Sequence, residues 1–157
     1  GSADWVTGNA DVQKLLNKNV IQLNAEFATE YLFFKCRNDS IWNNPAFRTA
    51  LLEAVPWDKL REKSFVKATT LVYPLSGYPQ VEGYSYTDAD EAASLMKDAR
   101  EKAGISADEK IPLVFAITDT DFMKERAQLF IDAWTPLGID VQIQKTPVER
   151  YLSSIPS

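Results

Sequence analysis

The sequence of 157 residues contains no histidine, and this absence excludes several kinds of chemistry. Histidine is the commonest general base and a frequent zinc ligand, so Ser–His pairs, Cys–His pairs and the usual zinc or iron sites are ruled out. The single cysteine, Cys36, cannot form an intramolecular disulfide and has no histidine to activate it. We therefore expect Cys36 to be a structural, half-buried thiol, and we expect no catalytic residue, cofactor or metal ion.

Long apolar runs and clusters of basic residues are also missing. No run approaches the roughly 18 apolar residues of a membrane-spanning helix, and the chain does not open on the basic-then-apolar pattern of a signal peptide. The net charge is −5 and no cluster of Lys and Arg is present, which argues against a nucleic-acid surface. Gly1 and Ser2 resemble the remnant of an expression tag, so the chain is interpreted as a fragment of a larger protein.

The residues that are present are typical of one soluble globular domain. Apolar residues make up 45% of the chain and charged residues 25%. A chain of this length can bury roughly 70% of its unfolded surface. The four Trp, six Tyr and eight Phe could supply stacking surfaces for a ligand, although core packing is the simpler role.

The clearest pattern lies between residues 111 and 145, where two strands flank a helix. The apolar run IPLVFAIT, residues 111–118, predicts a buried strand, and alternating apolar and polar residues predict a second strand over residues 139–145. Two strands that are joined by a packed helix are most simply parallel, with a right-handed crossover. The segment therefore predicts an α/β core, which by itself says nothing about function.

The helix between these strands has one apolar stripe and clear ends. Asp119 and Asp121 are expected to cap its start, where acidic side chains also favour the positive end of the helix dipole. Pro136 and Gly138 are expected to stop it. The stripe, spaced i, i+4, i+7 and i+11, consists of Met123, Ala127, Phe130 and Trp134.

Two further helices are predicted ahead of this core. Asn44 and Pro45 form an N-cap and first-turn pair, and Pro56 ends the helix that they start. The second helix begins within residues 87–90 and ends at Gly104. Their apolar faces are Phe47, Ala50, Leu51 and Ala54 in the first helix, and Ala92, Leu95, Met96, Ala99 and Ala103 in the second.

The remaining segments carry weaker patterns. Residues 31–36, which open on the run YLFF, are interpreted as a central strand covered on both faces. A long ordered loop is expected over residues 64–86, and loops of that length are usually functional or packed against a neighbour. Shorter predictions are strands over residues 3–7 and 20–23, and helical turns over residues 9–16, 57–63 and 147–152.

Four motifs follow one another along the chain: a Pro-x-x-Arg-x-Ala-Leu helix, a loop with a Pro near Gly-Tyr, a helix that ends in Ala-Gly, and a Gly-Ile-x-Val strand. The residues that form them are Pro45, Arg48, Ala50, Leu51, Ala68, Pro74, Gly77, Tyr78, Ala92, Leu95, Ala103, Gly104, Gly138, Ile139 and Val141. In this order, the motifs resemble those of the extracytoplasmic solute-binding proteins of the oligopeptide and dipeptide ABC transporter family (family 5). The opening GSADW also resembles the Gly-x-x-Asp that commonly starts this lobe, which is a second interpretation of Gly1 and Ser2.

This resemblance implies an α/β fold of the periplasmic-binding-protein type (type II), a lobe with a mixed sheet flanked by helices. Residues 1–157 would form a single domain, the C-terminal lobe of a larger two-lobed protein. The parent protein would be periplasmic or otherwise extracytoplasmic and membrane-anchored, with its signal or anchor region outside this chain. The isolated lobe would be monomeric.

The resemblance also implies a function without catalysis. The parent protein would capture a peptide or another small solute between two closing lobes and deliver it to the membrane permease of an ABC transporter. Relatives that take nickel chelates, haem or sugars leave the ligand class open, and a protein-interaction domain without a small ligand is the alternative. An enzyme with paired carboxylates is disfavoured, because these acids stand at predicted helix starts, where they favour the dipole.

Ligands of open α/β sheets bind beyond the carboxyl ends of the strands, which points to the turn after residues 111–118. The candidates there are Thr118, Asp119, Thr120 and Asp121. Threonine hydroxyls and free helix N–H groups could take a carboxylate, and the aspartates could take an amine, while helix capping is the alternative role. A second set of candidates, for which core packing or simple exposure is the alternative, is Tyr31, Phe33 and Lys35.

Overall fold

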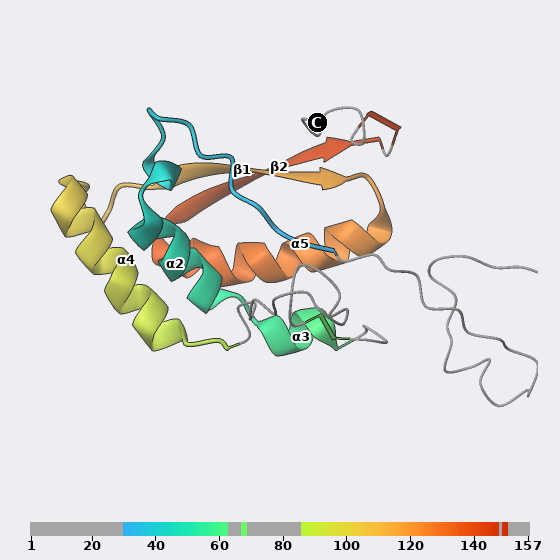
Figure 1. Ribbon diagram of the computed structural model, residues 1–157, viewed down its shortest axis with the longest axis horizontal. Coiled ribbons are helices and arrows are strands. Elements are labelled where there is room, and N and C mark those ends of the chain that lie inside the picture. Colours follow the sequence, from blue (N-terminus) through green and yellow to red (C-terminus); the bar gives the residue numbers. More distant parts are fainter. Residues whose placement is uncertain (1–29, 63–66, 69–85, 148, 151–157) are drawn as a thin grey trace, which may run out of the picture.

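A computed structural model (Figure 1) describes residues 30–62, 67–68, 86–147 and 149–150. The predictions for residues 3–7, 9–16 and 20–23 lie outside these ranges, as do most of those for residues 64–86 and 147–152. In chain order the described elements are η2 (Ile41–Asn43), α2 (Pro45–Ala54), α3 (Trp57–Arg61), α4 (Ala89–Ala103), β1 (Ile111–Thr118), α5 (Asp121–Trp134), η3 (Thr135–Leu137) and β2 (Ile139–Thr146).

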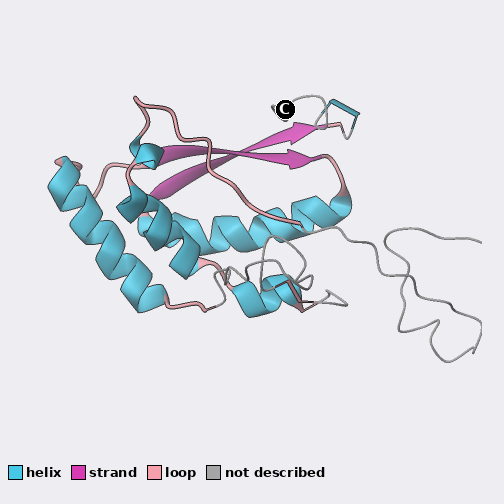
Figure 2. Ribbon diagram, in the orientation of Figure 1, coloured by secondary structure: helices cyan, strands magenta, loops and turns pink. Residues whose placement is uncertain are grey.

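Strands β1 and β2 form a two-stranded parallel sheet in the described part of the chain. Their register runs from Ile111 opposite Ile139 to Thr118 opposite Thr146. Figure 2 shows both strands along one side of the fold, with the helices below them. The predicted strand–helix–strand core and the α/β class are therefore confirmed, whereas the mixed sheet is not seen among the described strands, which are parallel.

Helix α5 is capped by a threonine and not by an aspartate. The Thr120 hydroxyl accepts a hydrogen bond from the backbone N–H of Met123 at 3.2 Å, which is the usual N-cap contact. Asp121 lies in the first turn, and Asp119 stands one residue before the cap. The prediction that these two aspartates cap α5 is wrong, because the threonine between them occupies the N-cap position. The end is as predicted, since η3 follows α5 and Gly138 adopts a left-handed φ of 79°.

The ends of α2 and α4 agree with those predicted from the sequence. Asn44 Oδ1 accepts from the Ala46 N–H at 3.0 Å, and Pro45 takes the first helical position of α2. Asp88 caps α4 by accepting from the Glu91 N–H at 2.9 Å, and Gly104 ends it with a left-handed φ of 68°. The helical turn predicted after α2 is α3.

One position on the predicted face of α4 is wrong. Ala103 is exposed, because the last turn of α4 lies at the outer edge of the fold (Figure 1), and Arg100 is buried in its place. Arg100 follows Met96 by four residues and so shares its side of the helix. A buried arginine on an apolar face is not a pattern that periodicity of apolar residues can reveal.

The core lies between α2, α4, α5 and the inner face of the sheet. Its largest buried side chains include Phe47, Leu51 and Trp134, and the Trp134 indole N–H donates to the Leu51 carbonyl at 2.9 Å. Phe115, Phe130 and Trp134 pack ring against ring with centroids 5.1–5.6 Å apart. This packing joins α2, α5 and β1 into one unit.

The sheet is covered by helices on one face only in the described residues. Ile111, Leu113 and Ile117 of β1 are buried, whereas Val114 between them is 61% exposed. The strand predicted at residues 111–118 is therefore present, but it is buried on one side only, and its other side is open.

The predicted central strand at residues 31–36 is wrong. This segment is not a strand in the structure, although its side chains still alternate. Leu32 and Phe34 pack against the core, while Tyr31 and Phe33 are exposed by 58% and 53%. A short apolar run does not specify burial on both faces, because it cannot tell which neighbours will cover it.

Cys36, at the end of this segment, is exposed and not half-buried as predicted. Its thiol donates to the Trp42 carbonyl at 3.4 Å, and an Arg48 N–H donates to its sulfur at 3.5 Å. The segment leaves the core after Phe34, and this exposes the thiol.

Candidate functional site

The turn between β1 and α5 lies at the carboxyl end of the parallel strands, where the sequence places the ligand site (Figure 1). The Asp119 N–H donates to the carbonyl of Thr146 at 2.9 Å, so the turn is tied to the end of β2. The Thr120 N–H donates to the Thr118 carbonyl at 2.8 Å, which closes the turn tightly. The candidate residues at positions 118–121 thus form one compact edge beside the last residue of the second strand.

Lys124 neutralises much of the negative charge at this turn. Its ammonium lies 2.9 Å from a carboxylate oxygen of Asp119 and 3.3 Å from one of Asp121. The hydrogen bond from Lys124 and its charge lower the pKa of Asp119, and the same contact raises the pKa of Lys124. A carboxylate with a lowered pKa stays ionised at neutral pH and is a poor proton donor, so the pair does not suit acid–base catalysis.

The two threonines of the turn have different positions. Thr120 uses its hydroxyl to cap α5, as the alternative role for these residues required. Thr118 is half-buried at the end of β1. Asp121 is the most open group of the turn, with a fully exposed side chain. Its described polar contact is the one with Lys124 at 3.3 Å.

The second set of candidates lies on the extended segment that begins at Glu30. Tyr31 and Phe33 stand with ring centroids 6.1 Å apart, and Lys35 is exposed beside them. Glu30 forms an ion pair of 3.4 Å with Arg126 of α5, which fixes the start of the segment near the first half of that helix. Within the described residues, no hydrogen bond or ion pair joins this set to residues 118–121.

A pocket that the sequence did not predict lies between α5 and the two strands. It has a volume of about 230 Å³ and is lined by Ile117, Lys124, Ala127, Gln128, Ile143 and Lys145. The alternation over residues 139–145 shows that Ile143 and Lys145 share one side of β2. It does not show that this side meets α5, which is why the pocket was missed.

The described residues show neither a metal cluster nor a membrane-spanning helix. No group of three or more Cys, Asp or Glu side chains is arranged to hold a metal ion in the ranges that the structure covers. Within the same ranges, every helix is too short or too polar to cross a bilayer.

Solved structures that share this fold are solute-binding proteins. Peptide-bound OppA of Listeria monocytogenes matches with 19% identity and a TM-score of 0.60, over 73% of this chain and 25% of that one. The murein tripeptide binding protein MppA of Escherichia coli matches with 16% identity and a TM-score of 0.58, over 74% and 24%. NikA of Staphylococcus aureus in complex with Ni(L-His)2 matches with 16% identity and a TM-score of 0.55, over 72% and 26%. No curated protein sequence matches significantly.

These matches define the class of the fold, a lobe of the periplasmic-binding-protein type, as the sequence led us to expect. The model of the family "Bacterial extracellular solute-binding proteins, family 5 Middle" matches residues 1–155, and the chain belongs to this family. The resemblance found in the sequence is thereby confirmed. The chain spans about a quarter of the length of the solved structures that it matches.

Proposed function

We propose that this chain is part of an ABC transporter substrate-binding protein that captures a peptide or another small solute between two lobes. The family match over residues 1–155 carries the proposal, since the family consists of extracellular solute-binding proteins. The captured solute is handed to a membrane permease for import. Binding and closure require no covalent chemistry, so the chain is not an enzyme in this proposal.

We propose further that residues 1–157 are one domain, the C-terminal lobe of the two. The chain covers about a quarter of each solved relative, which leaves room for a second lobe in a longer protein. The whole protein works outside the cytoplasm, in the periplasm or anchored to the outer side of a membrane. The lobe by itself is a monomer.

A peptide is the favoured ligand in this proposal. Two of the relatives are named for peptides, OppA with a bound peptide and MppA for a murein tripeptide. NikA, with Ni(L-His)2, supports a metal chelate as the alternative ligand class. A domain that binds another protein and no small solute is the remaining alternative.

In this proposal the ligand contacts come from both candidate sets. The exposed carboxylate of Asp121 meets an amine, and Lys35 meets a carboxylate. Tyr31 and Phe33 offer exposed aromatic surface to apolar side chains of the ligand. Thr118, Asp119 and Thr120 shape the edge of the site. The facing lobe completes the cleft.

Native mass spectrometry of the full-length protein, purified from the cells that produce it, tests the function. We expect a bound mass that denaturation releases and that fragments as a peptide. Release of a nickel chelate, haem or a sugar would contradict a peptide as the ligand, while the proposed transport function would still stand. Absence of any bound solute, together with no binding of a peptide library, would favour the protein-interaction alternative.

Substitution in the full-length protein tests the contacts. We expect the Tyr31→Ala, Phe33→Ala double variant to weaken binding of the identified solute about tenfold or more, because two aromatic contacts of about 1 kcal/mol each are lost. Lys97→Ala, on the exposed side of α4, is the matched control and should leave binding unchanged. Unchanged binding by the double variant, measured by calorimetry, would remove this segment from the site.

A further inference from the structure

The pocket between α5 and the strands combines an apolar floor with a polar rim. Ile117 and Ala127 are buried at its base, and Ile143 is half-buried beside them. The rim consists of Lys124, Gln128 and Lys145. Its volume of 230 Å³ exceeds the roughly 150 Å³ of an apolar cavity that accepts benzene. A ligand of about eight to ten non-hydrogen atoms therefore fits.

The charges at the rim favour a ligand with a single negative group. Lys124 is already bound to Asp119 at 2.9 Å and to Asp121 at 3.3 Å, so its charge is compensated. Lys145 is exposed and makes no ion pair with any residue that the structure describes. It stands beside the turn, because Lys145 lies opposite Ile117 in the strand register, one residue before the end of β2, and its charge also helps to lower the pKa of Asp119. Lys145 is thus the cation that a ligand in the pocket meets.

We propose that this pocket binds a small carboxylate with an apolar body of about four to eight carbon atoms. The carboxylate contacts Lys145, and the apolar body lies against Ile117 and Ile143. The same chemistry exists in a free alkyl carboxylate and in the carboxyl-terminal residue of a peptide with an apolar side chain. The inference rests on the pocket alone and does not depend on the proposed transport function.

The expected affinity is low, because the pocket is half open and the charged contact is exposed. An exposed ion pair contributes little, and ligands of this size bind weakly, so the dissociation constant is expected at about 1–10 mM. Such binding is measurable by nuclear magnetic resonance on the ¹⁵N-labelled chain of 157 residues. The probes are hexanoate for a free acid and, for a peptide terminus, N-acetyl-leucine, whose acetyl group would stay outside the pocket at its open side.

Saturable chemical-shift changes at the amides of Ile117 and Ile143 with either probe would support the site. The probe that binds more tightly would show whether the ligand is a free acid or a peptide terminus. Acetate lacks the apolar body and hexanol lacks the charge, so each should bind at least about fivefold more weakly than hexanoate. If neither probe causes saturable chemical-shift changes up to about 50 mM, the proposal is overturned, because the dissociation constant then lies well above the expected range.

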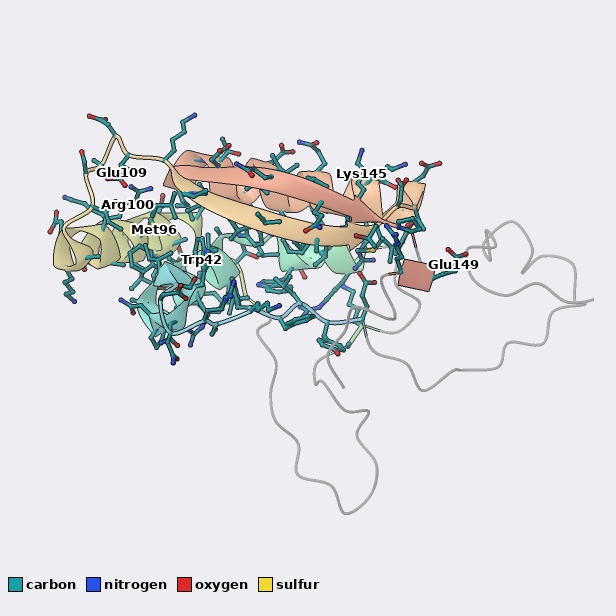
Figure 3. All side chains as sticks on the ribbon, turned by 90° about the horizontal axis from the view of Figure 1, so that it is seen from above. Trp42, Met96, Arg100, Glu109, Lys145 and Glu149 are labelled. Carbon is teal, nitrogen blue, oxygen red and sulfur yellow. The ribbon has the colours of Figure 1, made fainter. Side chains whose placement is uncertain are left out.

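Two charge-matched variants distinguish binding in the pocket from a general attraction of anions to the positive charges of the chain. Lys145→Gln should raise the dissociation constant for hexanoate about fivefold, the effect of losing one exposed ion pair. Lys97→Gln on α4, at the opposite end of the fold from Lys145 (Figure 3), should leave it unchanged. Both lysines are exposed, so both variants should keep the spectrum of the folded chain. Equal affinities of the two variants would overturn the assignment to Lys145.

Discussion

Arg100 holds the starting ends of both strands through carbonyl hydrogen bonds. Its side chain, only 5% exposed, donates to the carbonyls of Ser106 at 2.9 Å and Glu109 at 2.7 Å, just before β1 (Figure 3). It also donates to those of Leu137 at 3.2 Å and Gly138 at 3.1 Å, just before β2. Within the described residues it makes no ion pair, so these carbonyl dipoles compensate the buried charge.

Replacement of Arg100 should therefore be costly. Arg100→Met keeps much of the apolar stem but removes a donor from each of the four carbonyls, of which those of Ser106 and Gly138 keep a backbone N–H donor. We expect the free energy of unfolding to fall by about 2–4 kcal/mol. Urea denaturation of the 157-residue chain measures this. Lys102→Met, two residues along the same helix and exposed, is the control and should change stability by less than about 0.5 kcal/mol. Equal stability of the two variants would refute the role of the guanidinium.

The ion pair of Lys124 with Asp119 should be visible as a pH effect. Because the pKa of Asp119 is lower in the folded chain than in the unfolded chain, the pair stabilises the fold above about pH 4, the ordinary range for Asp. That contribution is lost as the pH falls through the folded-state pKa. Lys124→Gln should raise the pKa of Asp119 toward its ordinary value, as measured by carboxyl ¹³C titration. A pKa of Asp119 that does not move would show that another group holds it down.

At the scale of elements, most helix ends could be predicted, with the N-cap of α5 as the exception, and strand environment could not. Asn44 with Pro45, and Gly104, mark helix ends through local backbone chemistry that the residue itself carries. The parallel pairing of β1 and β2 followed from the single helix between them. The environment of residues 31–36 depends on segments distant in the sequence. The apolar run there therefore indicated a covered strand where the structure has an extended edge with Tyr31 and Phe33 exposed.

The candidate site shows the same limit. The position of the turn at the carboxyl end of the parallel strands follows from topology and was predicted, whereas its role in ligand binding stays a prediction. The Thr120 cap and the two ion pairs of Lys124 are local contacts, but the adjacent Asp and Thr residues offered several cap candidates and the sequence analysis chose the aspartates. The pocket beside Lys145 depends on which side chains meet across elements, and such contacts leave no signal in the spacing of residues along the chain.

Two glycines in the described part of the chain have left-handed backbone, and they offer a matched test of the α5–β2 connection. A Cβ at Gly138 would collide with the guanidinium of Arg100, which its hydrogen bonds hold in place, whereas a Cβ at Gly104 meets nothing. Both positions have positive φ, so alanine is strained at each by about 1 kcal/mol. We expect Gly138→Ala to destabilise the chain by at least about 1 kcal/mol more than Gly104→Ala. Equal melting temperatures would show that the arginine moves aside freely.

At the scale of the whole molecule, this chain supplies at most half of a closing cleft under the proposed function. Its exposed candidate residues, Tyr31, Phe33 and Asp121, have no facing surface within the described ranges. A ligand held from one side only buries less surface and loses most of its binding free energy.

The chain of 157 residues should consequently bind the proposed solute far more weakly than the full-length protein. We expect a dissociation constant at least about 100-fold higher, because roughly half of the contacts are missing. Calorimetry with the solute released from the full-length protein provides the comparison. A tight, saturable complex with the 157-residue chain would contradict the two-lobed cleft while leaving the family membership intact.

The position of Arg100 has a consequence for how such a protein can diversify. The guanidinium sets strand register at the amino ends of β1 and β2, and the candidate ligand turn lies at their other ends. Substitutions over residues 118–121 can therefore accumulate without shifting the alignment of the two strands. Under the proposed function, mutations that change ligand preference are in this way separated from mutations that endanger folding.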